Sequence, residues 1–407
     1  MQIHDYKYKA KRMKDGKVVK GTTEGPTKAS VDQYLFDNGL RAIEIERFSS
    51  VIAKLNRITL GKVISEQDLI FYLRQLSSLL RSGVKINEAT EILATQQTNK
   101  NARRIMYGIY YSVNSGSSLS DAFKEFPKEF PRVLVAMIGV GEAMGDLDEI
   151  LDDVVDYFEK QARLKASIKS TVMMPIIYLV VAIGVAAFLM VGVLPQFEGM
   201  YEGMGGELPG VTVFFMNVSN FFQDNILYII AGLIAFIIGF RMLYKKNTKV
   251  QRFFSVIAIR MPIFGEVVKL NNLSRIASTI AQLLKSHVPL QDSITTTQNT
   301  VQNRVYKELL SESHKAVTGG DNMSSVFEHH YASETVFNRM MNVGERSGDL
   351  GKMMKNLSNF YDEDSEVKVE RLKRALEPLL LIFIYALIVV MILAVMLPSL
   401  QLSDQLQ

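Results

Sequence analysis

Three apolar stretches, each long enough to cross a lipid bilayer, limit the folds that this chain can adopt. They cover residues 172–194, 222–244 and 379–397. The hydrocarbon core of a bilayer is about 30 Å thick and is crossed by roughly 20 apolar residues in a helix. We therefore expect three transmembrane helices, joined by much longer polar segments.

The charged residues fit the same picture. Hydrophobic residues make up 48% of the 407-residue chain and charged residues 22%, so apolar and soluble segments alternate. The formal net charge is only +4, and Lys and Arg gather near the apolar stretches. This pattern favours contact with a lipid membrane and indicates no nucleic-acid partner. The chain has no cysteine, which excludes disulfides and thiolate chemistry.

The distribution of cations predicts the orientation of the spans, because Lys and Arg near helix ends are retained in the cytoplasm. Residues 195–225 contain four acids and no Lys or Arg, whereas the other flanks are basic. We expect residues 195–221 to form a periplasmic loop and residues 398–407 a periplasmic tail. The first 20 residues lack the apolar core of a signal peptide, so the N-terminus is expected in the cytoplasm.

An internal repeat with an offset of 203 to 204 residues organises the rest. The stretch from Val140 to Leu147, VGEAMGDL, returns from Val343 to Leu350 as VGERSGDL. An earlier stretch, LLRSGVKI, returns as LLKSHVPL. Each copy is a polar segment followed by one outward-running span, and the unpaired second span brings the chain back inside. The sequence thus predicts two similar cytoplasmic domains, at residues 65–170 and 246–372.

Both copies have helical periodicity, with apolar residues recurring three and four positions apart. Helix starts are predicted where a serine is followed three residues later by an acid. These pairs are Ser65 with Asp68, Ser118 with Asp121, and Ser325 with Glu328. We expect helical bundles without a sheet. Residues 1–60 differ, because alternating side chains around an Asp15-Gly16 turn predict a small β-hairpin with one helix.

The repeated motif supplies most of the candidate site residues. In a helix, Glu142 and Asp146 would lie on one face, with glycines between them that permit close backbone approach. This predicts either a docking surface or a turn between helices. The alternative is that these residues only cap helices and form a solvated face. The candidate residues for partner contact are Gly141, Glu142, Gly145, Asp146, Gly344, Glu345, Gly348 and Asp349.

Two further acidic features are candidates. The run of acids from Asp146 to Asp156 could bind a basic partner or a hard cation, or simply form a solvated helix face. Glu377 and Pro378 open the third span, and an acid at membrane depth is costly. Glu377 is therefore a candidate for subunit contact, or for an ion pair with Arg374.

The sequence has no recognisable catalytic motif. The chain has no phosphate-binding loop of the GxxxxGK[ST] type, and its glycines at 139, 141 and 145 have the wrong spacing for a dinucleotide loop. The five histidines lack the spacing of a metal site. We expect no enzyme activity, no cofactor and no bound metal.

Taken together, these residues resemble the type II secretion system protein F family, which includes the type IV pilus platform proteins. The resemblance rests on the repeated Gly-Glu-x-x-Gly-Asp-Leu motif, on Leu-Leu-x-Ser-Gly-Val-x-Ile, on Phe126-Pro127 and on the Glu-Pro that opens the last span. It implies an all-α polytopic membrane protein with two cytoplasmic domains of about six helices each, in the bacterial inner membrane. It further implies a self-associating platform that couples a cytoplasmic assembly ATPase to polymerisation of pilin or pseudopilin subunits, beside other inner-membrane assembly proteins.

The second copy departs from the pattern at two turns, where His287 replaces the glycine matched by Gly83 and His330 stands where the first copy has Pro127. We therefore expect these turns to differ between copies. Two other functions are alternatives to the platform. A permease subunit driven by a separate ATPase would need a polar route, and a membrane enzyme would need catalytic residues inside the spans; neither is evident.

Overall fold

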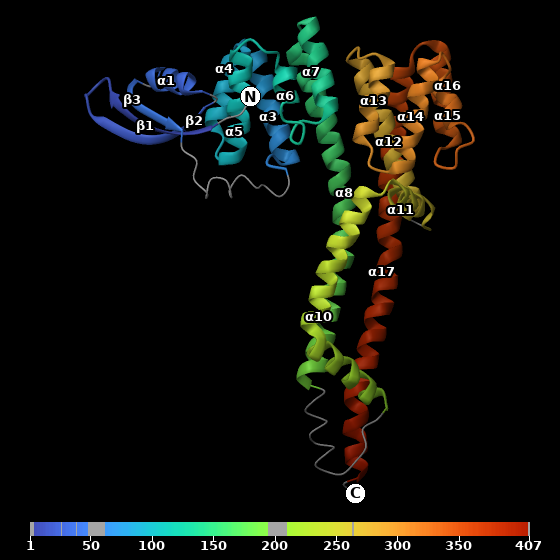
Figure 1. Ribbon diagram of the computed structural model, residues 1–407. Coiled ribbons are helices and arrows are strands. Elements are labelled where there is room, and N and C mark those ends of the chain that lie inside the picture. The colour runs from blue at the N-terminus through green and yellow to red at the C-terminus, as the bar shows by residue number, and fades with distance from the viewer. Residues whose placement is uncertain are drawn as a thin grey trace. The chain divides into compact units, whose positions relative to one another are not determined.

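The computed structural model describes residues 4–25, 27–37, 39–47, 62–193, 210–262 and 264–405. Its internal contacts divide the chain into two compact units (Figure 1). The first, here called the domain unit, consists of Met1–Arg163, Leu273–Gln302 and Tyr306–Asn359. The second, the span unit, consists of Leu164–Asn272, Asn303–Val305 and Phe360–Gln407.

The N-terminal region is a three-stranded antiparallel sheet with one helix. β1 (His4–Arg12) and β2 (Val18–Gly25) form the predicted hairpin, which turns through Gly16 at φ 68°. After α1 (Lys28–Asp37), β3 (Leu40–Arg47) pairs with β1, giving the order β2-β1-β3. The hairpin and the helix were predicted, but β3 was not. The predicted stretch from residue 48 to 60 lies outside the described residues.

The first helical domain follows the predicted bundle. Its helices are α3 (Glu66–Arg81), α4 (Ile86–Gln96), α5 (Lys100–Asn114), α6 (Leu119–Lys124), α7 (Arg132–Met144) and the start of α8 (Leu147–Phe188). Leu73, Leu76 and Leu134 are fully buried, and the rings of Phe123 and Phe130 stack at 4.2 Å. The predicted caps of α3 and α6 are confirmed, because Ser65 and Ser118 each accept a backbone N–H three residues on.

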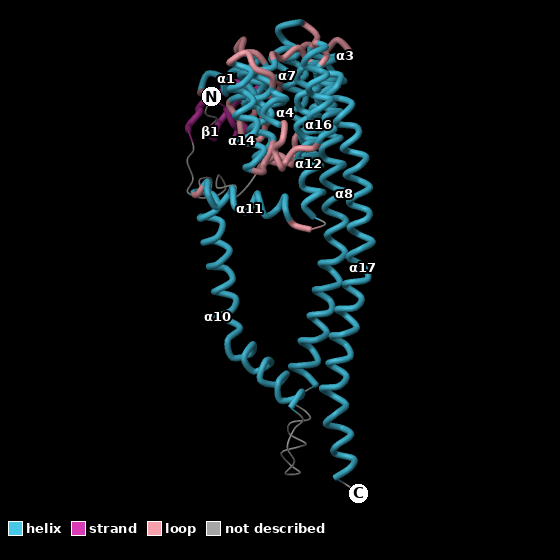
Figure 2. Tube along the Cα trace, turned by 90° about the vertical axis from the view of Figure 1, so that its right-hand side faces the viewer, coloured by secondary structure: helices cyan, strands magenta, loops and turns pink. Residues whose placement is uncertain are grey.

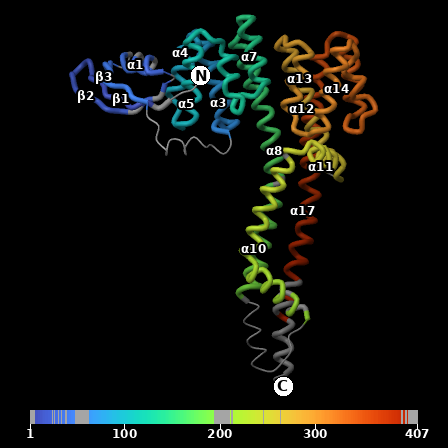
Figure 3. Tube along the Cα trace, in the orientation of Figure 1, coloured from blue at the N-terminus to red at the C-terminus, as the bar shows by residue number. Residues whose placement is uncertain are grey.

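The second helical domain repeats this order, as the blue-to-red colouring of Figure 3 lets the eye follow. Its helices are α12 (Phe264–Lys285), α13 (Leu290–Thr300), α14 (Arg304–Thr318), α15 (Met323–Phe327), α16 (Thr335–Ser347) and the start of α17 (Leu350–Gln405). Within the described residues, each copy thus has six helices, and their starts keep the offset of 203 to 204 from α4 onward. No strand occurs in the described part of either bundle.

One predicted cap is wrong. Ser325 lies inside α15, and its hydroxyl donates to the Asn322 carbonyl oxygen rather than accepting an N–H from Glu328. The Ser-x-x-Glu spacing was present, but α15 starts three residues earlier than that spacing predicts. A carboxylate from another helix satisfies its first N–H groups, as described below.

The two turns with histidine have opposite outcomes. His287 takes the same left-handed conformation as Gly83, with φ 58° against 86°, and its turn keeps the same two backbone hydrogen bonds, so the expected difference is wrong there. The turn after α15 does differ. Glu125, the residue after α6, has ψ −21°, whereas Glu328, the residue after α15, is extended with ψ 132°. His329 then takes a left-handed φ of 62°.

Long helices continue from both bundles into the apolar stretches. α8 passes through Pro175 and ends in a π-helical turn, η1 (Leu189–Val193). In the span unit the far parts of α8 and α17 lie side by side (Figure 2), and they line an apolar hollow of about 430 Å³. The third long helix is α10 (Gly210–Lys246).

Two helices in the described residues are long and apolar enough to cross a membrane, Leu147–Gly192 and Met216–Tyr244. The first contains residues 172–192 of the first predicted span, 172–194, and the second contains the whole second span, 222–244. The third predicted span, 379–397, lies within α17 and stays a prediction. Of the predicted periplasmic loop, 195–221, residues 210–221 form the start of α10, and residues 194–209 lie outside the described residues.

Candidate functional site

The repeated motif forms a sharp corner between two helices in each domain. α7 ends at Met144, Gly145 takes a left-handed φ of 83°, and α8 begins at Leu147. The Gly141 carbonyl oxygen accepts the N–H groups of both Gly145 and Asp146, at 2.9 and 3.0 Å. Gly348, at φ 74°, makes the same corner between α16 and α17. A residue with a β-carbon is strained at such φ values, which explains the glycine in both copies.

This corner corrects the prediction that Glu142 and Asp146 share a helix face. The chain reverses between them, so Glu142 lies on the last turn of α7 while Asp146 precedes α8. The motif therefore forms a turn between bundle helices, which is one of the arrangements predicted for it.

The glutamate of the motif caps a short helix in its own domain. Glu142 accepts hydrogen bonds from the backbone N–H groups of Leu119 and Ser120, the first two residues of α6. Glu345 does the same for Met323 and Ser324 at the start of α15. The first N–H groups of a helix have no partner within the helix, and a carboxylate is favoured there by the helix dipole. Each glutamate therefore joins two helices of one bundle.

The first glycine of the motif lets two helices pack closely. A β-carbon at Gly141 would stand 3.0 Å from the Ile150 side chain. At Gly344 it would stand 3.0 Å from the Cα atom of Leu350 and from the side chain of Met353. Both distances are tighter than ordinary carbon contacts, so the glycine sets the closest approach of the two helices at the corner.

Among the eight candidate residues of the motif, only the aspartates and the corner glycines are exposed. Asp146 and Asp349 are exposed, and the Asp349 carboxylate accepts the Lys352 N–H at 3.3 Å, as a helix cap. Of the eight motif candidates, the glutamates and the first glycines have structural contacts inside the bundles. The aspartates are the ones that remain accessible to a partner.

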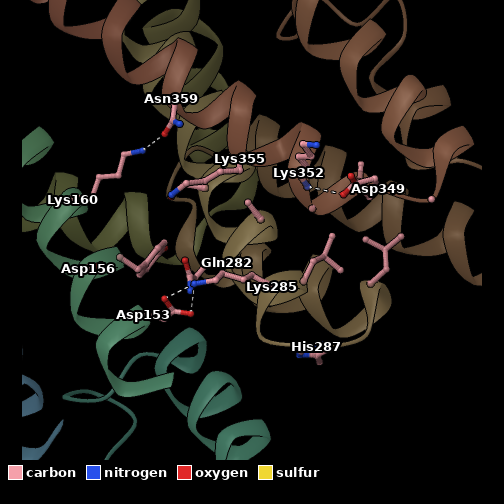
Figure 4. Close-up of a pocket in the computed structure, with 18 of the residues that line it drawn as sticks. Asp153, Asp156, Lys160, Gln282, Lys285, His287, Asp349, Lys352, Lys355 and Asn359 are labelled. Carbon is pink, nitrogen blue, oxygen red and sulfur yellow. Dashed lines mark hydrogen bonds and ion pairs between the residues drawn. The ribbon is translucent and has the colours of Figure 1, made fainter. Parts of the chain in front are cut away.

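A polar hollow of about 1210 Å³ lies in the domain unit beside Asp349 (Figure 4). It is lined by residues of both copies, from α8, α12, α13 and the α16–α17 corner. Five of its lining residues are cationic and three are anionic; the charged residues are Lys160, Arg163, Lys285, Lys352, Lys355, Asp153, Asp156 and Asp349. The hollow is therefore slightly basic, with the exposed aspartate of the second motif on its lining.

Hydrogen bonds link the two copies around this hollow. The Lys285 ammonium group contacts both carboxylate oxygens of Asp153, at 2.6 and 2.7 Å. On the other side, Lys160 Nζ donates to Ser358 Oγ at 3.2 Å and to Asn359 Oδ1 at 3.1 Å. These contacts join α8 of the first copy to α12 and α17 of the second. The repeats are thus held together by polar groups that water or a ligand could compete for.

A buried tyrosine adds a third link. The hydroxyl groups of Tyr157 and Thr279 lie 2.8 Å apart. Because Thr279 donates its proton to the Arg275 carbonyl oxygen, Tyr157 is the donor in this pair. Burial raises the pKa of Tyr157, against smaller opposing effects of Thr279 and Arg275. The phenol therefore stays protonated at every physiological pH, and this link does not titrate.

The acidic run on α8 is partly used by other contacts. Asp152 accepts the Ser77 hydroxyl at 2.5 Å and forms an ion pair with Arg81, while Asp153 pairs with Lys285. Among the described residues, no group of three or more His, Asp or Glu side chains is arranged to hold a metal ion. The run is better described as a helix face engaged in ion pairs than as a cation site.

Glu377 and Pro378 lie within α17, and both are exposed in the span unit. Arg374 pairs with Glu370, one turn before it, at 3.5 Å. The ion pair of Arg374 with Glu377 that the sequence suggested is therefore not the one that forms. Glu377 stays a candidate for contact with another subunit.

Sequence reasoning missed a buried carboxylate. Glu129 is only 5% exposed, and it accepts the N–H groups of Val63 and Ile64, which enter α3. It thereby fixes the entry of the chain into the first bundle. Its partners are more than sixty residues away in sequence, and no spacing pattern in a single sequence signals such a contact.

Comparison with known proteins decides the family. The family described as type II secretion system (T2SS), protein F, matches residues 72–195 and 276–398, the two repeats found above. The chain belongs to this family. Each matched range takes in the Gly-Glu-x-x-Gly-Asp-Leu corner and most of the long helix after it, so the family match follows the repeat of this chain.

Relatives from both kinds of machine resemble the chain over nearly its whole length. A type IV pilus assembly protein PilC of Myxococcus xanthus is 28% identical over 396 residues, covering 97% of this chain and 94% of that protein. PilC of Thermus thermophilus is 29% identical and covers 97% of each. A type II secretion system protein F of Pseudomonas aeruginosa is 27% identical and covers 96% of each. Similar proteins are thus named for type IV pilus assembly and for type II secretion.

Proposed function

We propose that this protein is the inner-membrane platform of a type IV pilus or type II secretion machine. In this role it couples a cytoplasmic assembly ATPase to polymerisation of pilin or pseudopilin subunits, and it works as a homo-oligomer among other inner-membrane assembly proteins. Both helical domains lie in the cytoplasm, and the chain crosses the membrane three times and ends in the periplasm. The basic flanks and the acidic 195–225 segment support this orientation.

The observation that carries the proposal is the continuity of α8 and α17. Each begins at a motif corner in a helical domain and runs without a break into an apolar stretch. At 1.5 Å per residue, the 42 residues of α8 are about 63 Å long. Movement of either bundle would pass along its continuous helix towards the membrane, which is what coupling an ATPase to subunits in the bilayer requires.

Asp349 is the residue that we place at the ATPase contact. It is exposed at the second corner, directly before α17, so a partner bound there would act at the start of the helix that continues into the third apolar stretch. Asp349→Lys should weaken ATPase recruitment, because reversing a charge in a complementary contact replaces attraction by repulsion. A loss of about 1.4 kcal/mol would lower binding tenfold. The measurement is the yield of photo-crosslinks in native membranes from a probe at the exposed Arg346.

The matched control is Glu312→Lys, a charge reversal at an exposed position on α14. It should leave the crosslink yield unchanged. Capture of an assembly ATPase or a pilin-like subunit from Arg346 would support the platform, and a fall with Asp349→Lys alone would support the contact. Capture of transporter components alone would favour a permease subunit. If the yield of crosslinks to the ATPase were equal in the two variants, Asp349 would not be part of the ATPase contact.

A further inference from the structure

A short helix lies directly after the second span. α11 (Thr248–Arg260) is separated from α10 by Asn247 alone, whose side chain accepts the N–H groups of Lys249 and Val250 and so starts the new helix. In Figure 2, α11 runs crosswise to α10 and to the far part of α17, all within the span unit. The chain therefore changes direction at the predicted cytoplasmic end of the second span.

One face of α11 is occupied by protein. Ser255 and Ile259, one turn apart, are buried. The Ser255 hydroxyl accepts the Arg304 N–H at 3.0 Å, and its carbonyl oxygen accepts the Asn303 side-chain amide at 3.2 Å. The start of α14 thus fixes how α11 is rotated about its own axis.

The apolar residues of the remaining surface are gathered in one sector. Phe253 is 61% exposed, Phe254 38% and Ile257 39%. At 100° per residue, these three side chains lie within about 100° of one another around the helix. Large exposed side chains concentrated in this way indicate an apolar environment on that side.

Cations occupy the sector next to the apolar one. Lys249, Arg252 and Arg260 are exposed and lie between the apolar side chains and the buried face. The whole stretch from residue 241 to 265 has six cations and no acid, the first acid being Glu266. Such a stretch attracts phosphate groups rather than a basic or neutral protein surface.

The apolar sector continues the surface of the span. The Phe254 ring contacts the rings of Phe240 and Tyr244 on α10, with centroids 5.2 and 6.3 Å apart. Gln251 also donates to the Tyr244 carbonyl oxygen at 2.8 Å, which holds the two helices together. Tyrosine at the end of an apolar helix is typical of the boundary between lipid tails and water.

We propose that α11 is a membrane-surface helix that binds anionic phospholipids. The side chains of Phe253, Phe254 and Ile257 enter the boundary of the acyl chains. Lys249, Arg252 and Arg260 contact the lipid phosphates. Amphipathic helices with an apolar face beside a basic one lie in the bilayer interface in this way. The inference rests on the membrane placement in the proposed function. It adds a membrane anchor at the point where the chain enters the second helical domain.

The absence of cysteine from the chain makes a direct test simple. Single cysteines placed at Ile257 and, separately, at Phe253 would be spin-labelled in the full-length protein. The protein would be placed in nanodiscs of phosphatidylcholine, with or without phosphatidylglycerol. The measurement compares collisions of the label with oxygen, which concentrates in lipid, and with a water-soluble nickel complex. Leu233→Cys on α10 serves as the lipid reference and Glu328→Cys, exposed on the second bundle, as the water reference.

We expect the labels at 257 and 253 to shift towards the Leu233 value, more so with phosphatidylglycerol. Changing Lys249 and Arg252 to Gln should reduce that shift. If the labels at 253 and 257 gave the collision values of the Glu328 label while the Leu233 label gave those of lipid, this inference would be overturned. The proposed platform function would not be affected. A shift independent of phosphatidylglycerol would overturn the anionic-lipid part. If the label at position 233 collided with oxygen and the nickel complex as a label in water does, the membrane placement on which the proposed function rests would be contradicted.

Discussion

Gly344→Val is expected to destabilise the second helical domain by about 3 kcal/mol, at the upper end of the cost of overfilling a packed core. A β-carbon at Gly344 would stand 3.0 Å from the Cα atom of Leu350, and valine adds two methyl groups beyond it. The backbone at the start of α17 cannot yield without opening the corner at Gly348. Thermal unfolding of the full-length protein in nanodiscs, followed by far-ultraviolet circular dichroism, measures the loss.

Two matched substitutions separate this effect from a general intolerance of larger residues. Gly351→Ala, in the first turn of α17, has its nearest neighbour at an ordinary 3.4 Å, and alanine is the better helix former, so stability should be unchanged or slightly higher. Gly141→Val should cost less than Gly344→Val, because its contact is with the Ile150 side chain, which can move. Equal tolerance of valine at 344 and alanine at 351 would contradict the close packing of α16 on α17.

Glu345→Ala is expected to cost about 2–4 kcal/mol and to loosen α15. It removes the acceptor from two backbone N–H groups, those of Met323 and Ser324, in residues that are buried. A hydrogen bond to a charged group contributes about 1.5–3 kcal/mol, and a buried N–H without a partner is costly in itself. Hydrogen exchange measured by mass spectrometry should show faster exchange over residues 323–328.

Glu345→Gln keeps one acceptor oxygen without the charge, so its effect should fall between those of wild type and Glu345→Ala. Arg346→Ala, next in sequence and exposed, should change stability by no more than about 0.5 kcal/mol. The same ranking is expected at Glu142 for α6. If Glu345→Ala lowered ATPase crosslinking without changing exchange in α15, the glutamate would be a docking residue and our structural assignment would be wrong.

The features that sequence predicted well depend on local or repeated patterns. Apolar stretches, the offset of 203 to 204 and the caps at Ser65 and Ser118 can each be read within a short window or by comparing the two copies. The features it missed depend on contacts far apart in the chain. β3 needs β1 as a partner, and Glu129 needs Val63 and Ile64. The boundary between α10 and α11 is marked by Asn247 alone, without the glycine or proline that usually signals a break.

The motif shows the same division between local and distant signals. Glycine followed by aspartate is typical of one helix ending and another beginning, so the corner at Gly145-Asp146 was readable from the sequence. The spacing of Glu142 and Asp146 suggested a shared face only if the helix continued, and the left-handed Gly145 prevents that. The role of Glu142 was not readable, because the N–H groups that it caps lie 22 and 23 residues earlier.

The most direct test of the central claim, two helical domains on the cytoplasmic side joined through three spans, is cysteine labelling of intact and inverted membrane vesicles. Single cysteines would replace Lys128, Glu328, Glu207 and Ser403 in this cysteine-free chain, and a membrane-impermeant maleimide would label them. We expect Lys128→Cys and Glu328→Cys to react only from the cytoplasmic side, and Glu207→Cys and Ser403→Cys only from the periplasmic side. Reaction of Lys128→Cys and Glu328→Cys from opposite sides, or of Glu328→Cys and Ser403→Cys from the same side, would contradict the account.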